Sequence, residues 1–523
     1  MIRGIRKDLG FISRVLLRRK AILLAALVVT LASCTQYIIT MLIWTTPGFT
    51  LDDSWIHLAF ARSIYEGRPW QYSPGYPSTG STSPLWSIVL WPLFYVTTDP
   101  IGLVWGTIII ATLLYCFCSF IVGLTVYTHT KSDLYSCLAI IGFVLVPRNT
   151  WLMLSGMETP LFVSLIFLAI LLSEQRDAKY DFILGIVCGL AFLSRPEAVL
   201  LLAILLPARV FVLTRYHQTG MRRAISVIMI PLIALAIAAP WILYCYSTTG
   251  FPLPDTIYSK SHIVQPEEYV YWIGWWIYWL NTMPFLIVGA LSGVVLARRG
   301  HPHTWLMAIA MIVLYHFTAP YNALINNARY LVPIFDLLMV TAISGLAILL
   351  LRVVVLSGVR SRLLHVLPVV VILAIVVLPV VPDYMFQANF FGNSVKNINE
   401  QQVHIGYWLR NNTPQDAVLA IHDAGALRFF SNRTVMDIAG LVSPQIAHGH
   451  MTNTELVLYL RDHGCDYFVF FDDLFAYWGW AYFSGAYEKL YTVHLVDNVI
   501  SGRDTMSVFY INWTLTVYGP RTG

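Results

Sequence analysis

Long apolar segments follow one another through most of this 523-residue chain. Many run for about 16 to 28 residues, which is enough, or nearly enough, to cross the hydrocarbon core of a bilayer. Charged residues make up 12% of the chain, whereas a soluble domain contains roughly 25%. Because a backbone inside a bilayer must satisfy its own hydrogen bonds, this pattern predicts a polytopic α-helical membrane protein.

The basic residues lie between the apolar segments, and their positions predict the topology. Basic loops mark the cytoplasmic side of a membrane protein. Eleven spans, with the N-terminus in the cytoplasm and the C-terminus outside, place every basic cluster on that side. These clusters are Arg3, Arg6, Lys7, Arg14, Arg18, Arg19 and Lys20, then Arg176 and Lys179, Arg215, Arg222 and Arg223, Arg298 and Arg299, and Arg352, Arg360 and Arg362.

The first apolar segment, residues 21–44, is too long for a signal-peptide core and has no small-residue cleavage site after it, so we expect a retained span. The short apolar segment 85–96 contains Pro92 and is interpreted as a helix lying in the membrane interface. The eleven expected spans are residues 21–44, 101–127, 132–148, 158–173, 181–194, 197–213, 224–246, 270–297, 303–318, 330–351 and 363–382.

The composition changes from about Pro382, where the chain becomes polar and mixed. Short segments with helical and strand periods alternate there, which predicts a small external α/β domain at 383–523 after a membrane module at 1–382. Expected helices are 395–410 and 454–462, and expected strands are 417–421, 435–438, 467–471 and 508–511.

An acidic pair, Asp52 and Asp53, follows the first span directly. Residues 53–66 have the spacing of an amphipathic helix, which brings His57 within reach of Asp53. Helix capping and the helix dipole need only one acidic residue. Two adjacent carboxylates beside a membrane are costly to hold, so the pair predicts a functional site in the first external loop.

Several short segments occur in an order typical of one superfamily. They are Asp52-Asp53-Ser54-Trp55-Ile56, Ala61-Arg62, Glu66-Gly67, Thr82-Ser83-Pro84-Leu85-Trp86, Ser155-Gly156-Met157-Glu158-Thr159-Pro160-Leu161-Phe162, Ser194-Arg195-Pro196-Glu197, Asn327-Ala328-Arg329-Tyr330-Leu331-Val332-Pro333, Asp423-Ala424-Gly425-Ala426 and Val435-Met436-Asp437. With these segments the chain resembles the GT-C membrane glycosyltransferases. That superfamily includes protein mannosyltransferases, the lipid A aminoarabinose transferase and bacterial arabinofuranosyltransferases. The sequences of these segments are most similar to the actinobacterial arabinofuranosyltransferase-like branch, although Trp55 stands where that branch often has a smaller aromatic residue.

The resemblance implies a polyprenyl-phosphate sugar donor, used on the external face with inversion, and a glycan, lipid or protein acceptor. Such chemistry needs a carboxylate base, a cation for the leaving phosphate and an apolar groove for the lipid. The resemblance implies that the base is Asp52 or Asp53. Alignment on the start of the acidic segment favours Asp52, whereas alignment on Ala61-Arg62, together with the helical row that contains His57, favours Asp53.

Candidate residues for the remaining roles come from the same resemblance and from the expected topology. Arg329, Arg195 and Lys260 are the expected phosphate ligands, with snorkelling as the alternative for Arg329 and a structural ion pair for Arg195. His57 and Glu158 are expected to bind the acceptor or sugar. Trp70 and Tyr72 are expected to stack on a sugar, with an interfacial aromatic belt as the alternative.

No cofactor is expected. The chain has no Cys/His spacing typical of zinc. A divalent cation at Asp52 and Asp53 is conceivable but not expected, since the mannosyl and aminoarabinose relatives work without one. The expected surroundings are the plasma or inner membrane, without nucleic acid. Two other functions remain open: a flippase or transporter of lipid-linked sugars, which would be expected to show inverted repeats, and a non-enzymatic partner in envelope assembly.

Overall fold

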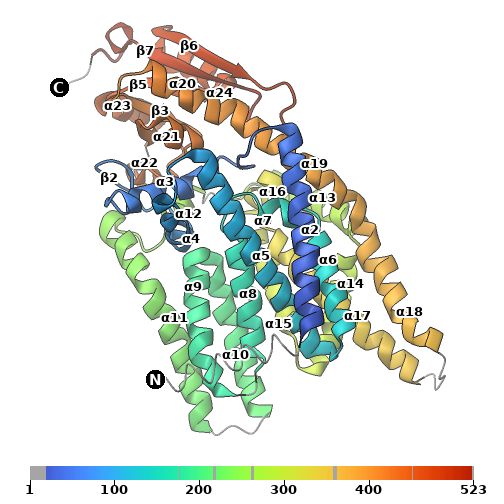
Figure 1. The fold of residues 1–523 in the computed structure, drawn as a ribbon. Helices are drawn as coiled ribbons and strands as arrows, with labels where there is room; N and C mark the ends of the chain where they lie inside the picture. The colour runs from blue at the N-terminus through green and yellow to red at the C-terminus, as the bar shows by residue number, and fades with distance from the viewer. Residues whose placement is uncertain are drawn as a thin grey trace.

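A computed structural model describes residues 19–175, 177–215, 220–260, 264–356, 362–449 and 451–520. Figure 1 shows a bundle of long helices with a β-sheet at one end, as expected for a polytopic helical protein with an α/β part. The basic segment 1–18, Arg176 and Arg360 lie outside the described residues, as do the side chains of Arg215, Arg222 and Arg362.

Each expected span coincides with helix. The bundle contains α2 (Lys20–Trp44), α5 (Pro100–Thr130), α6 (Asp133–Leu145), α7 (Asn149–Met153), α8 (Thr159–Ser173), α9 (Asp181–Ser194), α10 (Val199–Arg215), α11 (Gly220–Thr249), α12 (Asp255–Lys260), α13 (Pro266–Thr282), α14 (Phe285–Arg299), α15 (His303–Thr318), α16 (Pro320–Ala328), α17 (Val332–Leu356) and α18 (Arg362–Ile372). In the described residues, 6 helices are long and apolar enough to cross a membrane, or 8 if each bent pair is one span. The chain is therefore a multi-pass membrane protein. Because α6 and α8 are apolar but shorter than 18 residues, the count of eleven spans stays a prediction.

One of the expected spans is bent. The segment 270–297 consists of α13 and α14, which meet at 85°. A second bend, of 111°, follows the expected span 303–318, between α15 and α16. Pro284 lies at the first bend and Pro320 opens α16, and proline cannot donate the backbone hydrogen bond that a continuous helix needs.

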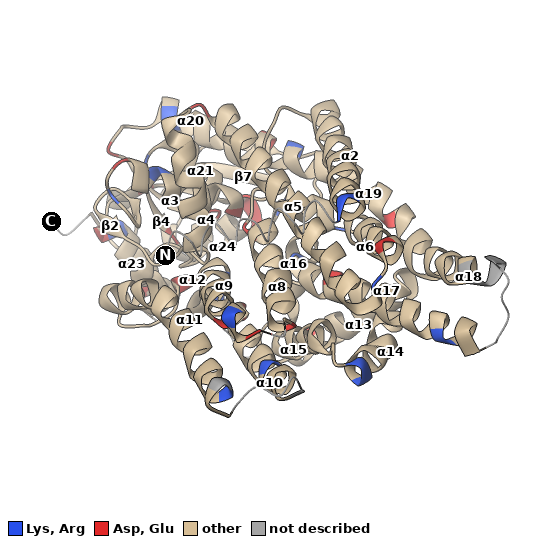
Figure 2. Ribbon diagram, turned by 60° about the horizontal axis from the view of Figure 1, so that its bottom comes forward, with Lys and Arg blue, Asp and Glu red and all other residues tan. Residues whose placement is uncertain are grey.

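Charged residues gather at the ends of the helices. Figure 2 shows long helices almost free of Lys, Arg, Asp and Glu, with basic segments near the ends of α11 and α14. Arg298 and Arg299 lie in the last turn of α14, which agrees with the expected position of basic residues at the ends of membrane spans. The side of the membrane on which each end lies remains a prediction.

The first loop folds as expected in its helices. It contains α3 (Asp53–Tyr65), the paired strands β1 (Gln71–Ser73) and β2 (Tyr76–Pro77), and α4 (Pro84–Leu90), which continues as a 3₁₀ turn at Trp91–Tyr95. Helix α3 is buried on more than its apolar side, because Ser54, His57 and Ser63 are buried together with Trp55 and Phe60. Another part of the chain therefore covers its polar face.

The C-terminal part begins on a helix. After π and 3₁₀ turns at Leu373–Val380, α19 (Val381–Ile398) runs through the expected boundary between residues 382 and 383, so the division into two domains remains a prediction. A π turn then leads into α20 (His404–Asn412). The remaining helices are α21 (Gly425–Ser431), α22 (Pro444–His448), α23 (Asn453–Asp462) and α24 (Asp472–Trp478).

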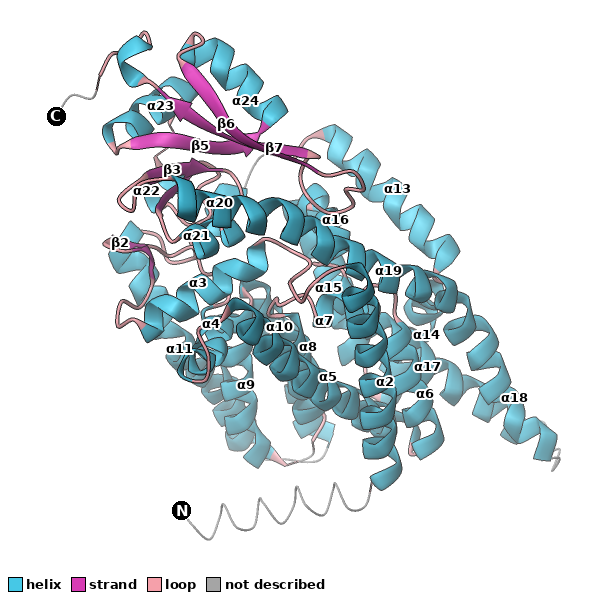
Figure 3. Ribbon diagram, turned by 45° about the horizontal axis from the view of Figure 1, so that its top comes forward, coloured by secondary structure: helices cyan, strands magenta, loops and turns pink. Residues whose placement is uncertain are grey.

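The sheet has five strands in the order β4-β3-β5-β7-β6. Strands β4 (Thr434–Asp437), β3 (Val418–Ile421) and β5 (Cys465–Phe471) are parallel, whereas β7 (Thr505–Ile511) pairs antiparallel with β5 and with β6 (Tyr487–His494). All four expected strands are confirmed and β6 is additional. Helix α21 follows β3 and lies between the sheet and α3 (Figure 3).

The C-terminal part packs directly on the first loop. Trp55 of α3 lies against Phe429 and Phe430 of α21, with ring centroids 4.9 and 4.6 Å apart. Arg62 donates a hydrogen bond to the backbone oxygen of Phe429 at 3.0 Å. One buried apolar cluster runs from the bundle through α3 into α21, so this contact is part of the core.

Candidate active site

A cavity of about 380 Å³ lies between α3, the helix ends of the bundle and the loop before α17. Six of the residues expected at the site line it together, although the sequence separates them by up to 276 positions. They are Asp53, His57, Glu158, Arg195, Lys260 and Arg329.

Asp53 and Arg329 form the central ion pair of the cavity. The Arg329 Nη2 donates to Asp53 Oδ2 at 2.6 Å, and the arginine is 4% exposed. Three consecutive residues before it, Asn326, Asn327 and Ala328, have φ of 53°, 61° and 55°. Left-handed backbone is strained at an alanine, and such strain persists only where the surroundings enforce it. The strained turn fixes Arg329 beside α3.

Arg329 retains unused hydrogen-bond donors. Its Nε and Nη1 are buried and have no hydrogen-bond partner among the described residues. The Tyr330 hydroxyl lies 3.3 Å from Nη2, on the side that already serves Asp53. Because a buried guanidinium donor without an acceptor is costly, the free edge is suited to an anion that enters the cavity.

The ionisation of Asp53 follows from these neighbours. Burial acts to raise the pKa of Asp53, but the positive charges of Arg329 and Lys260 outweigh it and lower the pKa to about 2. Asp53 is therefore a carboxylate at neutral pH, and it accepts a proton poorly while both cations face it.

A second group of charged side chains lines the neighbouring wall of the cavity. Glu158, just before α8, lies 3.3 Å from His57 Nε2 and 3.4 Å from Arg195 Nε. Arg195 also contacts Glu197 at 3.6 Å, and Glu197 accepts a hydrogen bond from the Tyr315 hydroxyl at 2.9 Å. The expected ion pair of Arg195 is thus present, and the same guanidinium borders the cavity.

Three titratable residues of the cavity lining were missed as site residues by sequence reasoning: Glu197, Tyr315 and Tyr330. The Arg195 guanidinium lies over the Tyr330 ring, with its central carbon 4.5 Å from the ring centroid. Tyr330 follows Arg329 directly and Glu197 lies two residues after Arg195, so closeness to expected site residues in the chain was the available signal. Tyr315 lies in an apolar segment with no such signal.

Asp52 faces away from the cavity. Its two carboxylate oxygens each accept a backbone N–H bond of 2.7 Å, from Gly425 and Ala426 at the start of α21. A Cβ at Gly425 would meet the Asp52 backbone oxygen at 1.9 Å, so the close approach requires glycine. Burial and the charge of Asp423 raise the pKa of Asp52 well above its usual range, against the lowering effect of the two N–H donors.

The two carboxylates therefore do not converge on a common ion. Asp52 is saturated by backbone donors and Asp53 is held by Arg329. This arrangement does not fit a divalent cation bridging the acidic pair.

Trp70 and Tyr72 lie outside the cavity lining, and their contacts are those of packing. Trp70 lies against Trp241 with centroids 4.8 Å apart, and the Tyr72 hydroxyl donates to the Ala424 oxygen at 2.6 Å. Tyr72 also packs on Phe60 at 5.1 Å. The expected stacking of these two rings on a sugar has no support from this arrangement, because both are occupied between the first loop and neighbouring elements.

Apolar residues complete the cavity on the side of the bundle. Val199 of α10 and Leu314, on α15, border it, together with Ile257 and Ala323. Helix α10 belongs to a candidate span and α15 to a bent pair that passes the same test. The charged end of the cavity is thus continuous with an apolar wall formed by membrane helices.

This fold, a multi-pass bundle with an acidic first loop beside a cavity and a C-terminal α/β part, is shared with solved structures of ArnT and AglB. The similarity to solved structures extends over nearly the whole chain. The structure of ArnT from Cupriavidus metallidurans bound to undecaprenyl phosphate matches with a TM-score of 0.58 and 12% identity, covering 94% of this chain and 98% of that one. ArnT in the apo state matches with a TM-score of 0.54 and 13% identity, over 94% and 99% of the two chains.

An archaeal enzyme has the same fold. The Archaeoglobus fulgidus oligosaccharyltransferase AglB, in complex with an inhibitory peptide and a dolichol-phosphate, matches with a TM-score of 0.54 and 13% identity, over 85% of this chain and 69% of that one. A domain of unknown function, DUF8728, matches residues 396–510. No curated protein matches the sequence.

Proposed function

We propose that this protein is an inverting glycosyltransferase that moves a sugar from a polyprenyl-phosphate donor to an acceptor at the membrane surface. One observation carries the proposal: a carboxylate, Asp53, and a buried arginine with a free donor edge, Arg329, meet in a cavity with an apolar wall. ArnT with undecaprenyl phosphate and AglB with a dolichol-phosphate share the fold, which supports a lipid phosphate as the ligand.

In the proposed reaction the acceptor hydroxyl attacks the anomeric carbon of the donor. The new carbon–oxygen bond forms on the face opposite the leaving phosphate, and the bond from the anomeric carbon to the phosphate oxygen breaks. The phosphate leaves with the electron pair and is held by Arg329, with Lys260 and Arg195 at the cavity wall. Asp53 takes the proton of the acceptor hydroxyl.

Donor binding also activates the base. A phosphate on the free edge of Arg329 adds negative charge beside Asp53 and shares the cations that lower its pKa. The pKa of Asp53 then rises toward its ordinary value, which improves proton acceptance only when the donor is in place. Substrate binding and base strength are coupled through one guanidinium.

Glu158 and His57 are proposed to contact the acceptor or the sugar. They lie in the same cavity, and the Nδ1 of His57 is buried without a hydrogen-bond partner among the described residues. The resemblance of the sequence to the arabinofuranosyltransferase-like branch makes a pentofuranose the first sugar to test. Glycan, lipid and protein acceptors all remain open.

The topology completes the proposal. We place the cavity and residues 383–523 on the external face of the plasma or inner membrane, with the N-terminus in the cytoplasm. Asp416 is exposed and is therefore a suitable position for a cysteine reporter. Labelling of Asp416→Cys from outside intact cells is expected, and exclusive labelling after permeabilisation would overturn the orientation.

The function is tested with purified protein in liposomes that contain a panel of radiolabelled polyprenyl-phosphate pentoses and hexoses. Release of free polyprenyl phosphate, separated by thin-layer chromatography, is expected for at least one donor. Asp53→Asn should abolish release, whereas the exposed Asp416→Asn is the matched control. Movement of intact donor between leaflets without cleavage would favour the flippase instead, and the absence of both would favour an assembly partner.

A further inference from the structure

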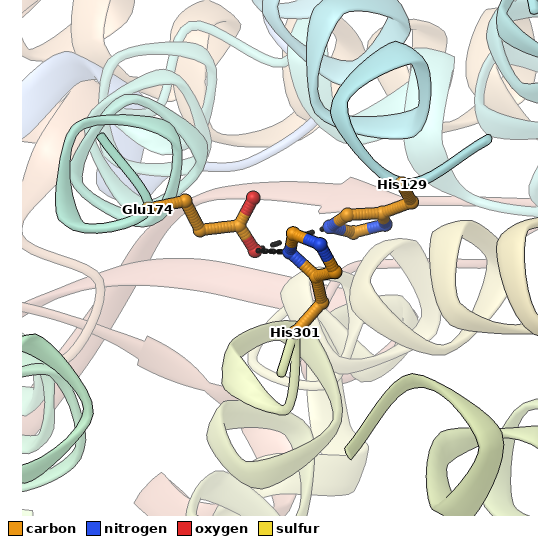
Figure 4. Close-up of side chains that lie close together, drawn as sticks. All are labelled: His129, Glu174 and His301. Atoms are coloured by element: carbon orange, nitrogen blue, oxygen red, sulfur yellow. Dashed lines mark hydrogen bonds and ion pairs between the residues drawn. The ribbon is translucent and has the colours of Figure 1, made fainter. Parts of the chain in front are cut away.

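A second buried cluster of titratable side chains lies at the opposite end of α8 from the cavity. Glu158 precedes this helix and Glu174 follows it, so the two carboxylates are separated by 15 helical residues, about 22 Å. Figure 4 shows Glu174 between His129, from the last turn of α5, and His301, from the loop between α14 and α15.

The imidazoles converge on one carboxylate oxygen. Glu174 Oε1 lies 3.1 Å from His129 Nε2, 3.2 Å from His301 Nδ1 and 3.2 Å from His303 Nδ1. The side chains of His129, Glu174 and His303 are 0, 3 and 1% exposed. Within the described part of the chain, every ion pair of Glu174 is with a histidine.

Hydrogen bonds alone do not satisfy this group. His301 Nδ1 faces the shared oxygen but makes no hydrogen bond in the described structure, and His303 Nε2 is also buried without a partner. Protonating all three rings would place three positive charges around one negative charge. A cation that accepts electron pairs from imidazole nitrogens and a carboxylate oxygen removes both difficulties.

The distances suit a transition metal. One ligand atom each from His129, Glu174 and His301 lies within 4.8 Å of the others. Ligands about 2.1 Å from a tetrahedral zinc ion are about 3.4 Å apart, so small side-chain rotations bring these atoms to coordination distance.

Partners that orient the ligands are already in place. His129 uses its other ring nitrogen, Nδ1, on the Ser344 hydroxyl at 3.2 Å, and the Thr128 hydroxyl donates to the second oxygen of Glu174 at 2.9 Å. Metal-binding histidines and carboxylates characteristically have such supporting hydrogen bonds.

We propose that His129, Glu174 and His301 bind a divalent first-row transition ion, with zinc as the best match to two imidazoles and a carboxylate. His303 orients Glu174. The ion enters past His301, whose side chain is 26% exposed. The ion joins α5, α8 and the α14–α15 loop, so it stabilises the end of the bundle that lies away from the donor cavity.

The site also has a path to the cavity. Helix α8 starts beside Glu158, and α15 starts at His303 and carries Tyr315, which borders the cavity. Two rigid helices therefore have one end at each site. Metal binding by these side chains does not depend on the sugar-transfer reaction.

The experiment uses full-length protein without a polyhistidine tag, purified in detergent, treated with a chelator and titrated with Zn²⁺ against a fluorescent competitor. We expect one zinc per chain, a higher melting temperature with zinc, and a visible Co²⁺ spectrum of low coordination number. His301→Ala should remove all three, and Ser344→Ala should weaken zinc binding about tenfold to a hundredfold.

The control is His494→Ala, at an exposed histidine of β6, which should bind zinc like the wild type. Equal zinc stoichiometry and affinity in the wild type and His301→Ala, both monodisperse, would overturn the site, as would a wild type that binds no zinc. If Glu174→Gln does not fold, His301→Ala still decides the question, because its side chain is partly exposed.

Discussion

The two faces of α3 differ although adjacent residues define them. On the face toward α21, both oxygens of Asp52 are saturated by backbone N–H groups. On the face toward the cavity, Asp53 meets an arginine that keeps unused donors. One face is a packed docking surface, and the other is prepared for a ligand.

The different surroundings of Asp52 and Asp53 assign a different role to each: helix capping to one and catalysis to the other. Capping accounts for Asp52, but the helix that it caps is α21 and not its own, since Asp52 makes no side-chain cap bond to α3. Catalysis is the proposal for Asp53. With Asp52 held by α21, Asp53 is the member of the acidic pair that lines the cavity.

The largest expected effect tests the cavity face. Asp53→Asn preserves the shape of the side chain but removes its proton acceptance, so the rate of sugar transfer should fall roughly a hundredfold to ten-thousandfold. The measurement is donor turnover at equal amounts of monodisperse protein, with Asp416→Asn as the control. A near-normal rate in Asp53→Asn, together with a dead Asp52→Asn variant that folds normally, would reverse the comparison.

The next effect concerns the arginine that serves Asp53. Arg329→Ala should weaken donor use by about 1.5–3 kcal/mol, the contribution of a charge-assisted hydrogen bond. Arg329→Lys should restore part of this loss, because lysine supplies the charge but not the two-pronged geometry. Donor affinity is measured by competition with polyprenyl phosphate, and unchanged affinity in Arg329→Ala would assign the residue to a purely structural role.

The pH dependence of kcat/KM gives a further test of Asp53 as the base. Because the pKa of Asp53 is lowered to about 2, the carboxylate stays ionised down to that pH, and kcat/KM should show no loss from this group above about pH 4. Removing the Arg329 charge raises the pKa, so the acid limb should move to higher pH. Profiles of kcat/KM for the wild type and Arg329→Ala provide the measurement; coincident acid limbs would contradict the assigned base.

The sequence predicted most helices and strands of the fold but not the edge strand or the bends between helices. Span helices, α3 and the strands that pair in the sheet were visible because apolar periodicity follows directly from burial. Strand β6 was not predicted, since it lies at the sheet edge and most of its residues are exposed or half-buried. The bends at Pro284 and Pro320 depend on packing between helices, which composition does not encode.

The candidate site shows the same limit. Sequence named Asp53, Arg329, Glu158 and Arg195 because they stand in recognisable segments, but it did not separate the environments of Asp52 and Asp53. That separation depends on α21, which lies about 370 residues further along and whose glycine permits the close approach. The cluster of His129, Glu174 and His301 has no spacing to detect, because three distant helix ends bring it together.

The smallest expected effect tests the docking face. Asp52→Asn keeps one acceptor for the two N–H groups of α21, so it should lower the stability of the folded protein by about 0.5–2 kcal/mol, as for loss of a helix cap. Gly425→Ala should act on the same surface, because its Cβ would meet the Asp52 backbone. Thermal unfolding in detergent measures both, alongside turnover by the protein that remains folded. We expect a lower melting temperature with turnover within a few-fold of wild type. If Asp52→Asn instead unfolds like the wild type and loses transfer activity, Asp52 acts in the chemistry, and the contact with α21 is the means by which the C-terminal part completes the active site.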